Sequence, residues 1–330
     1  MDKSTPVRIG VLGAAAIVPA ALMNPGRGVH EAQILAIASR DPKRAYALAK
    51  KRGIPRVHQT YSALLADDDI DAIYIPLPNS LHAKWTIRAL KAGKHVLCEK
   101  PFASNAQEAE EMAQMARQTG LVLSEAFAYR YHSLTARVRE IMASGEIGSI
   151  QHFEAQFCFL LPSPNNIRFN YDLSGGALMD CGCYPVSLIR YLAQAEPTVE
   201  SAEARLFKAQ VDRRMTADLS FADGRTAHIV CDMLYSRLFR SSLTVQGSEG
   251  KLAVTNPFHP HWFNWLKVQG RNGSYTERGS NENVYALQLR AFVRAIHGER
   301  IINTHPGDAI GNMRVIDAIY EKAGLQKRGT

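Results

Sequence analysis

The sequence predicts an α/β protein with an N-terminal Rossmann domain, built on a doubly wound parallel sheet, and a C-terminal α+β domain with a large open, mainly antiparallel sheet. Short apolar runs alternate with helical patterns up to residue 123, which is typical of a parallel sheet. Beyond residue 150, apolar and polar residues alternate with a period of two, as in half-buried strands. At 330 residues the chain exceeds the size of most single cores, so we predict two domains, 1–128 and 129–330.

The first half reads as strands and helices in alternation. Strands are expected at the apolar runs 7–13, 34–38, 72–75, 95–98 and 121–123. Asp41 precedes Pro42 as a helix N-cap, and this helix should end at Gly53. A second helix is expected from about Ser80 to Ala92, and a third from the capping box at 104–107 to Gly120. This order predicts a doubly wound sheet.

The second half begins with a helix expected at 133–144. Alternating strands follow at 153–159 and 215–221, and the runs 243–246 and 252–254 flank Gly247-Ser248-Glu249-Gly250 as a hairpin. Helical patterns cover 182–192, 284–296 and 308–322. The second domain should therefore be mainly antiparallel sheet with a few helices.

Composition argues against several classes of function. The formal charge is +8, but Lys and Arg are mixed with Asp and Glu, which is typical of solvated faces and not of a nucleic-acid surface. The chain shows neither a signal-peptide pattern nor an apolar run long enough for a membrane span, so we expect a cytoplasmic protein. Five cysteines suggest reduced, mostly buried thiols, and Cys181-Gly182-Cys183 lacks metal-site spacing, so no metal is expected.

The first candidate site is the turn Gly13-Ala14-Ala15-Ala16-Ile17, which links the first strand to a helix. A dinucleotide-binding fold places the pyrophosphate at such a turn, at the N-terminus of the helix. Only Gly13 matches the glycines of the G-x-G-x-x-G fingerprint; Ala15 is a small substitute and Val18 is larger than the usual glycine. An ordinary strand-to-helix turn is the alternative interpretation.

The second strand ends at Ser39-Arg40, where NAD-dependent enzymes usually carry an acidic residue that binds the ribose hydroxyls. Asp41 is one position late and is better explained as a helix cap. Arg40, with Arg44 one helical turn further on, could bind the 2′-phosphate of NADP. We therefore predict NADP in preference to NAD, the alternative being two solvated arginines.

Two further segments carry polar residues suited to proton transfer. Lys100, in Cys98-Glu99-Lys100-Pro101, follows a strand at the edge where the crevice of the sheet should open. Asp180 and Tyr184 share one face if their segment is helical, although Pro185 either kinks that helix or begins a new one. A solvated lysine and a packed tyrosine are the alternatives. We assign no catalytic role to His259-Pro260-His261-Trp262.

Together these motifs resemble the glucose-fructose oxidoreductase / inositol dehydrogenase / rhizopine catabolism (Gfo/Idh/MocA) family over nearly the whole chain. The likeness rests on several segments, which are Ile73-Tyr74-Ile75-Pro76-Leu77-Pro78-Asn79-Ser80-Leu81-His82, Ala92-Gly93-Lys94-His95-Val96-Leu97-Cys98-Glu99-Lys100-Pro101, Glu125-Ala126-Phe127 with His132, the Gly-Gly-x-Leu-x-Asp-x-Gly-x-Tyr stretch ending at Tyr184, and Tyr285 with Gln288. Tyr184 stands where inositol dehydrogenases have His. The chain therefore looks closest to the branch of dihydrodiol dehydrogenases, NADP-dependent xylose dehydrogenases and sugar ketoreductases.

The resemblance implies that Lys100 sits beside the nicotinamide and that Tyr184 acts as acid and base, with Lys100 lowering its pKa. It implies a supporting carboxylate at Asp180 and an arginine near cofactor and substrate at Arg168. Residues that match positions lining the nicotinamide half are Pro76, Leu77, Asn79, His82 and Glu99. It also implies a homodimer through the C-terminal sheet. Departures from the family pattern are Ala15, Val18, Ser133 in place of proline, and Ser174 in place of a third glycine.

The sequence thus predicts an NADP(H)-dependent oxidoreductase that acts on a secondary alcohol or hemiacetal carbon of a sugar, polyol or cyclic vicinal diol. A ketoreductase of nucleotide-linked sugars is a second possibility. A third, of another class, is a non-catalytic NADP-sensing regulator, because the galactose-regulon repressor resembles the same family. The presence of Lys100, Asp180 and Tyr184 together favours an enzyme, because a sensor has no need of all three.

Overall fold

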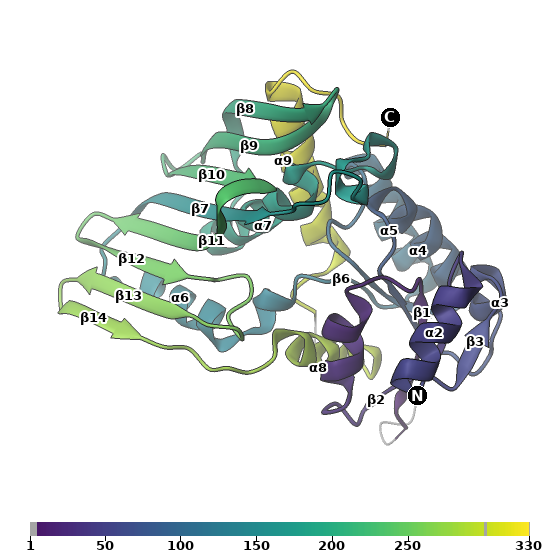
Figure 1. Ribbon diagram of the computed structural model, residues 1–330. Helices are drawn as coiled ribbons and strands as arrows, with labels where there is room; N and C mark the ends of the chain where they lie inside the picture. The colour runs from purple at the N-terminus through teal and green to yellow at the C-terminus, as the bar shows by residue number, and fades with distance from the viewer. Residues whose placement is uncertain (1–4, 300–301, 330) are drawn as a thin grey trace. The chain divides into compact units, whose positions relative to one another are not determined.

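The computed structural model describes residues 5–299 and 302–329 (Figure 1). The chain folds into two compact units: the described residues of 1–128 with those of 285–310, and the described residues of 129–284 with those of 311–330. The described residues of 285–310, which the sequence analysis placed in the second domain, cluster with the first unit. Arg290 Nη2 donates a hydrogen bond of 2.8 Å to Gly28 O, and the Ser124 and Thr304 hydroxyls are 2.8 Å apart.

The first unit is built on a six-stranded sheet in the order β3-β2-β1-β4-β5-β6, in which every pair of neighbours is parallel. Its strands are β1 (Val7–Leu12), β2 (Ala32–Ala38), β3 (Arg56–His58), β4 (Ala72–Ile75), β5 (His95–Cys98) and β6 (Leu123–Glu125). All residues of β4 are buried, as expected for a strand whose two faces are both covered. The predicted doubly wound parallel sheet is confirmed.

The helices of this unit begin and end largely where local sequence signals place them. They are α1 (Asn24–Gly26), α2 (Pro42–Arg52), α3 (Tyr61–Leu65), α4 (His82–Lys91), α5 (Ala106–Thr119) and α8 (Val284–Ile296). The Asp41 carboxylate caps α2 by accepting from Lys43 N, and Gly53 ends it with φ +74°. The N-cap of α5 is Asn105, not Ser104, because the Asn105 side chain accepts from Glu108 N, and the Glu108 carboxylate accepts from Ser104 N.

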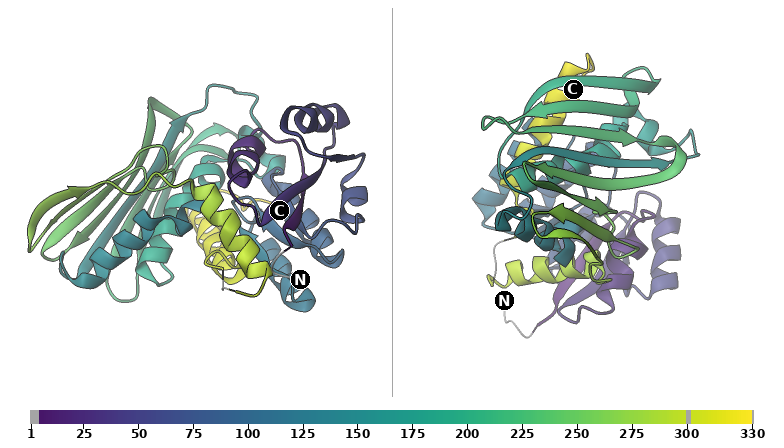
Figure 2. Two further views of the ribbon diagram at one scale, coloured as in Figure 1. Left: turned by 90° about the horizontal axis from the view of Figure 1, so that it is seen from below. Right: turned by 90° about the vertical axis from the view of Figure 1, so that its left-hand side faces the viewer.

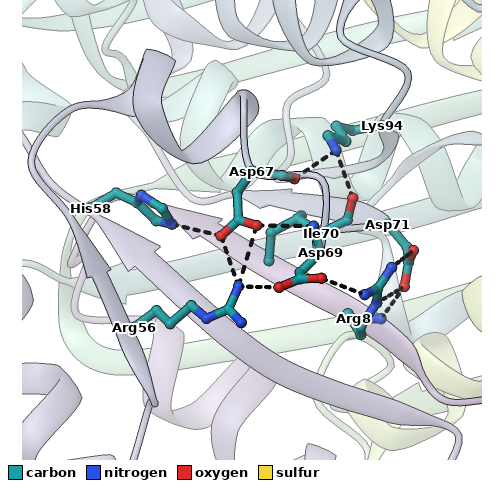
Figure 3. A network of polar contacts seen from close by, with 8 residues as sticks. All are labelled: Arg8, Arg56, His58, Asp67, Asp69, Ile70, Asp71 and Lys94. Atoms are coloured by element: carbon teal, nitrogen blue, oxygen red, sulfur yellow. Dashed lines mark hydrogen bonds and ion pairs between the residues drawn. The ribbon is translucent and has the colours of Figure 1, made fainter.

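A network of polar contacts joins residues at or near the amino-terminal ends of strands β1, β3, β4 and β5 (Figure 3). Its eight members are Arg8, Arg56, His58, Asp67, Asp69, Ile70, Asp71 and Lys94. Arg8 donates two hydrogen bonds to the Asp71 carboxylate, of 2.9 Å from Nε and 2.8 Å from Nη2. Lys94 Nζ donates to the carbonyl oxygens of Asp67 and Ile70, each at 2.8 Å. Because Arg8 lies in β1 and Asp71 directly precedes β4, the network holds two central strands in register.

The second unit is built on an eight-stranded sheet in the order β14-β13-β12-β11-β7-β10-β9-β8, in which only β7 and β10 pair in parallel. Its strands are β7 (Ile150–Leu160), β8 (Thr198–Lys208), β9 (Val211–Ser220), β10 (Thr226–Asp232), β11 (Leu234–Gly247), β12 (Gly250–Thr255), β13 (Trp265–Gly270) and β14 (Gly273–Glu277). β11 and β12 form the predicted hairpin, with Gly247 paired to Gly250 across Ser248-Glu249. The predicted large, mainly antiparallel sheet is confirmed.

The helices of the second unit lie on one face of this sheet, and none of the described helices of this unit covers the opposite face (Figure 2). These helices are α6 (Ser133–Ser144) and α7 (Cys183–Ala193), with most of α9 (Pro306–Lys322). The five cysteines are all buried and free of disulfides, as the sequence predicts, and burial raises the pKa of Cys158 to about 12. Within 5–299 and 302–329, the structure contains no helix that is both long and apolar enough to span a membrane.

Candidate active site

The predicted cofactor-binding residues of the first unit follow four adjacent strands. Gly13 comes directly after β1, Ser39 after β2, Pro76 after β4 and Glu99 after β5. These strands are neighbours in the order β2-β1-β4-β5 and run parallel, so their carboxyl ends meet at one edge of the sheet. The fold therefore brings together residues that are up to 86 positions apart, from 13 to 99. This edge is where ligands bind in open α/β sheets.

The turn after β1 begins with the buried Gly13 and becomes accessible from Ala14 onward. Gly13 has φ +116° and donates a hydrogen bond of 2.7 Å to Ala38 O. A Cβ on Gly13 would lie 3.0 Å from Leu77 Cδ2, so glycine suits both the conformation and the space. Ala16 and Ile17 are exposed, whereas Val18 is fully buried ahead of a short π-helix, Pro19–Met23. The accessible part of the turn, from Ala14 to Ile17, lies where a pyrophosphate would approach.

One arginine of α2, Arg44, contacts this turn, and a second, Arg40, follows the end of β2. Arg44 Nη2 donates a hydrogen bond of 2.9 Å to Ala14 O, and both Arg40 and Arg44 are exposed. Ser39 is buried, and its hydroxyl accepts from Asp41 N at 3.3 Å. Because the Arg44 side chain reaches the glycine turn, its guanidinium lies close to the end of β2, where the adenosine ribose of a dinucleotide would lie. This arrangement suits an anionic group on that ribose.

His82 links the two loops that follow β4 and β5. The imidazole is fully buried, with Nε2 2.8 Å from Leu77 O and Nδ1 2.8 Å from Pro101 O. Burial lowers the pKa of His82, opposed by these two carbonyl groups, and the charge on Lys100 lowers it further. The Lys100–Pro101 peptide bond is cis. His82 therefore connects the loop that carries Lys100 to the loop after β4 through its two ring nitrogens.

The Glu99 carboxylate accepts one hydrogen bond from strand β4 and one from its own loop. Tyr74 donates a hydrogen bond of 2.7 Å to Glu99 Oε1, and Lys100 N donates one of 3.3 Å to Oε2. Burial raises the pKa of Tyr285 in α8, and the charge on Glu99 raises it further. Asn79 begins the short 3₁₀ turn Asn79–Leu81 that leads into α4. Pro76, Leu77, Asn79, Glu99 and Lys100 thus belong to two adjoining loops of one sheet edge.

These residues fit a dinucleotide. The backbone from Ala14 to Ile17 is accessible to a phosphate, and Arg44 adds positive charge beside it. Among the described residues, no three or more His, Cys, Asp or Glu side chains lie close enough together to hold a metal ion.

The second unit holds the other predicted site residues, Arg168, Asp180 and Tyr184. Arg168 Nε lies 2.7 Å from Asp180 Oδ2 in an ion pair. The charge on Asp180 raises the pKa of Arg168, and Tyr184 also contributes to this rise. The three residues therefore act on one another electrostatically, although twelve positions separate Arg168 from Asp180.

Asp180 and Tyr184 lie on consecutive helical turns. Leu178–Gly182 forms a single π-helical turn, and α7 begins directly after it at Cys183. The residues that flank the junction, Gly182 and Cys183, both have right-handed helical φ/ψ, so the helical backbone continues from the π-helical turn into α7 without a break. Pro185 therefore lies within one continuous helical segment, whose winding changes from π-helical to α-helical just before it, and it does not begin a new helix.

The Tyr184 ring is buried in an aromatic cluster, with 9% of the residue exposed. Its centroid lies 5.2 Å from that of Phe157, 5.3 Å from that of Phe258 and 6.1 Å from that of His259. His259 in turn stacks on Trp262, with centroids 4.6 Å apart. The histidine-aromatic loop, which the sequence analysis assigned no catalytic role, therefore forms one side of the Tyr184 environment. No pattern in the sequence joins it to Tyr184, because 75 positions separate Tyr184 from His259.

Sequence reasoning also missed Asp212 and Arg328, which are fully buried and paired at 2.9 Å in the second unit. Arg328 stands in Lys327-Arg328-Gly329, a segment whose composition suggests a solvated basic stretch. Asp212 is the second residue of β9 and is followed by two arginines. Nothing in either local pattern indicates that these two residues meet.

Comparison with known proteins matches both halves of the chain to models of one protein family. Residues 7–127 match the family model described as "Oxidoreductase family, NAD-binding Rossmann fold" (GFO_IDH_MocA), and residues 135–253 match the model of the GFO/IDH/MocA C-terminal domain. The two matched ranges together cover more than half of the chain.

Individual relatives are similar over nearly their whole length. The chain is 37% identical to D-xylose 1-dehydrogenase (NADP(+)) 2 of Haloferax volcanii, covering 95% of this chain and 96% of that protein. It is 35% identical to the dTDP-3,4-didehydro-2,6-dideoxy-alpha-D-glucose 3-reductase of Saccharopolyspora spinosa, covering 98% of each. A crystal structure of a 3-ketoreductase from Actinomadura kijaniata, in complex with NADP and TDP-benzene, superposes with a TM-score of 0.90 at 29% identity and covers 98% of both chains.

Proposed function

Because the chain belongs to the GFO/IDH/MocA family of oxidoreductases, we propose that it is an NADP(H)-dependent dehydrogenase or reductase of sugars, polyols or cyclic vicinal diols. Its substrate carbon would be a secondary alcohol or hemiacetal carbon. The observation that carries the proposal is the Arg168–Asp180 ion pair on the turn before Tyr184, in a chain that also retains Lys100. A protein that only binds a dinucleotide has no need of this set.

The preference for NADP rests on Arg40 and Arg44. Both are exposed, and Arg44 donates a hydrogen bond to the glycine turn. No acidic side chain stands at position 39 or 40 to bind a 2′-hydroxyl. A guanidinium presents donors in a planar fork that suits a phosphate. The similarity to an NADP(+)-dependent xylose dehydrogenase and to a ketoreductase solved with NADP supports the same cofactor.

Bound NADP(H) would supply or accept the hydride, and the protein would handle the proton. In the oxidative direction we assign the Tyr184 oxygen as acceptor of the proton from the substrate hydroxyl; in reduction Tyr184 returns it to the carbonyl oxygen. Lys100, as an ammonium, would favour the phenolate form of Tyr184. Asp180 would hold Arg168, whose cation favours that same form.

A second candidate is a ketoreductase of nucleotide-linked sugars. It is favoured by the 35% identity to a dTDP-sugar 3-reductase and by the TM-score of 0.90 to a 3-ketoreductase. Both candidates use the same residues for hydride and proton transfer and differ in the group attached to the sugar. A non-catalytic NADP-sensing regulator is the third candidate, which the retained Lys100, Asp180 and Tyr184 disfavour.

We further propose a cytoplasmic homodimer formed through the uncovered face of the eight-stranded sheet. Several large apolar side chains of this sheet stay exposed, among them Leu206 in β8, Leu238 in β11 and Trp265 in β13. Burial of such side chains by a second copy would stabilise the pair. Light scattering behind size exclusion tests this directly, since a mass near twice 36.5 kDa supports the dimer.

The deciding experiment follows nicotinamide absorbance with purified protein. The panel pairs NADP with D-xylose, other aldoses and a cyclic vicinal diol, and pairs NADPH with keto-sugars, free and dTDP-linked. Lys100→Met is the control variant, expected to bind NADPH normally and to lose turnover. Lysine-dependent turnover of a free sugar or diol supports the first candidate, and turnover of dTDP-linked sugars alone supports the second. Tight NADPH binding without turnover of any substrate would favour the regulator.

A further inference from the structure

Arg328 is a fully buried cation in the second unit. Its Nε donates a hydrogen bond of 2.8 Å to Gly175 O, its Nη1 one of 2.9 Å to Gln326 O, and its Nη2 one of 2.9 Å to Asp212 Oδ1. The guanidinium carbon lies 4.0 Å from the ring centroid of Tyr320 and 5.1 Å from that of Tyr171. Every nitrogen of the guanidinium therefore donates a hydrogen bond, and aromatic rings add cation–π contacts.

Asp212 is the anionic partner at the start of β9. One carboxylate oxygen accepts from Arg328 and from the Tyr320 hydroxyl at 3.0 Å, and the other accepts from Leu178 N at 2.7 Å. Leu178 is the first residue of the π-helical turn that carries Asp180. The buried ion pair is thus hydrogen-bonded to the glycine segment at Gly175 O and to the π-helical turn at Leu178 N.

Backbone hydrogen bonds join this segment, residues 175–178, to the candidate site. Gly176 N donates to Arg168 O at 2.9 Å, and Asp180 N donates to Gly176 O at 3.0 Å. Both residues of the Arg168–Asp180 ion pair are therefore hydrogen-bonded through their backbones to Gly176, directly after the residue that Arg328 holds. A shift of this segment would move both charges relative to Tyr184.

The glycines of the segment fit against the same groups. A Cβ on Gly176 would overlap Asp212 Oδ1 and would lie 2.7 Å from the Tyr320 hydroxyl. A Cβ on Gly175 would lie 2.5 Å from Arg168 O and 2.7 Å from Asn170 O. The Gly-Gly pair thus brings the backbone into contact with Asp212 on one side and with the Arg168 segment on the other.

We infer that Arg328 is a positioning residue for the proposed reaction: by holding Gly175 directly and Leu178 through Asp212, it fixes where Arg168 and Asp180 stand. This inference rests on the proposed function, because it assigns Arg328 a part in the same chemistry. Arg328 acts on the reaction only through the residues it holds. Lysine cannot replace it fully, because an ammonium lacks the planar fork that reaches the Gly175 carbonyl and the Asp212 carboxylate together.

The test compares Arg328→Lys with the wild-type protein and with Arg314→Lys, a matched control at an exposed position of α9. Amide hydrogen exchange of residues 174–181 should become roughly tenfold faster in Arg328→Lys alone, because the segment opens without global unfolding. On the best substrate of the panel, kcat should fall about 10- to 100-fold with little change in the KM for NADPH. The pH profile of kcat should shift to higher pH, because the Arg168 cation no longer stands by Tyr184.

Unchanged exchange in 174–181 would overturn the inference, and so would faster exchange with kcat and its pH profile unchanged, which marks a purely structural role. Should Arg328→Lys fail to fold, the double variant Asp212→Asn with Arg328→Gln removes both charges together and so leaves neither one unpaired, and the same results are expected of it. If the wild-type protein turns over no substrate, the proposed function fails and the catalytic part of the inference fails with it. Failure of the proposed function can be distinguished from failure of the inference: in the first case the wild-type protein is inactive, but residues 174–181 still exchange faster in Arg328→Lys than in the wild type.

Discussion

Arg44 crosses from α2 to the glycine turn and donates its hydrogen bond to the Ala14 carbonyl oxygen at 2.9 Å. We predict that Arg44→Ala raises the Kd for NADPH about 10- to 100-fold, the loss expected for a hydrogen bond to a charged phosphate. The Kd for NADH should change far less. Quenching of protein fluorescence on titration with each nucleotide measures both constants.

The control for this prediction is Lys43→Ala, which removes an exposed cation from the same helix turn. It should leave the ratio of the two Kd values unchanged. Equal weakening of NADPH and NADH binding in Arg44→Ala would mean that the arginine only supports the turn and does not read the 2′-phosphate.

Tyr184→Phe should separate chemistry from packing. The ring contacts with Phe157 and Phe258 remain, so we expect a stable protein with nearly unchanged KM. The lost proton donor and acceptor should lower kcat by about 10²- to 10⁴-fold. Steady-state kinetics in both directions, beside thermal unfolding, give the measurement. A variant with wild-type kcat would remove Tyr184 from the mechanism.

Gly176→Ala should cost more stability than Gly224→Ala, although both glycines have positive φ. A Cβ on Gly224 meets no atom within 4 Å, so only the conformational cost of about 1–2 kcal/mol applies. A Cβ on Gly176 also overlaps the Asp212 carboxylate, which adds about 1–3 kcal/mol for overpacking. Urea unfolding of the two variants compares them, and equal losses would show that the segment moves aside without cost.

Arg8→Gln should destabilise the first unit in a pH-dependent way. Burial raises the pKa of Asp71, but the hydrogen bonds and charge of Arg8 outweigh it and hold the pKa below its ordinary value. A carboxyl whose folded-state pKa is depressed stabilises the fold above its unfolded pKa of about 3.9 and loses that contribution as the pH falls through the folded value.

The difference in unfolding free energy between wild type and Arg8→Gln should therefore be about 1.5–3 kcal/mol at neutral pH. It should shrink as the pH falls below about 4, because a protonated Asp71 no longer needs the arginine. Urea unfolding at a series of pH values measures it. A difference that stays constant down to about pH 3 would argue against an ionic origin.

Local sequence patterns were sufficient to predict most strands and helices of the first unit. Apolar runs bounded by caps and glycines located β1, β2, β4 and β5, because buried parallel strands are apolar on both faces. The short strand β3 (Arg56–His58) escaped prediction, since its exposed and half-buried residues carry no apolar run. Sheet order then explains why Gly13, Ser39, Pro76 and Glu99 share one edge.

The second unit was less predictable because its pairings are distant in sequence. The edge strands β8 and β14 are largely exposed and lack a clear apolar face. The π-helical turn at Leu178–Gly182 departs from the simple helix that the spacing of Asp180 and Tyr184 suggested. Arg328 and Asp212 lie 116 residues apart, and only the tertiary fold brings their charges together.

The contact of the Gly176 backbone with the Asp212 carboxylate has an evolutionary consequence. Any side chain at position 176 displaces a carboxylate that Arg328 and Tyr320 hold, so these four positions cannot change one at a time without penalty. Among related sequences they should covary as one epistatic unit. Substrate specificity would then diversify around this unit, in loops whose residues are free to change singly.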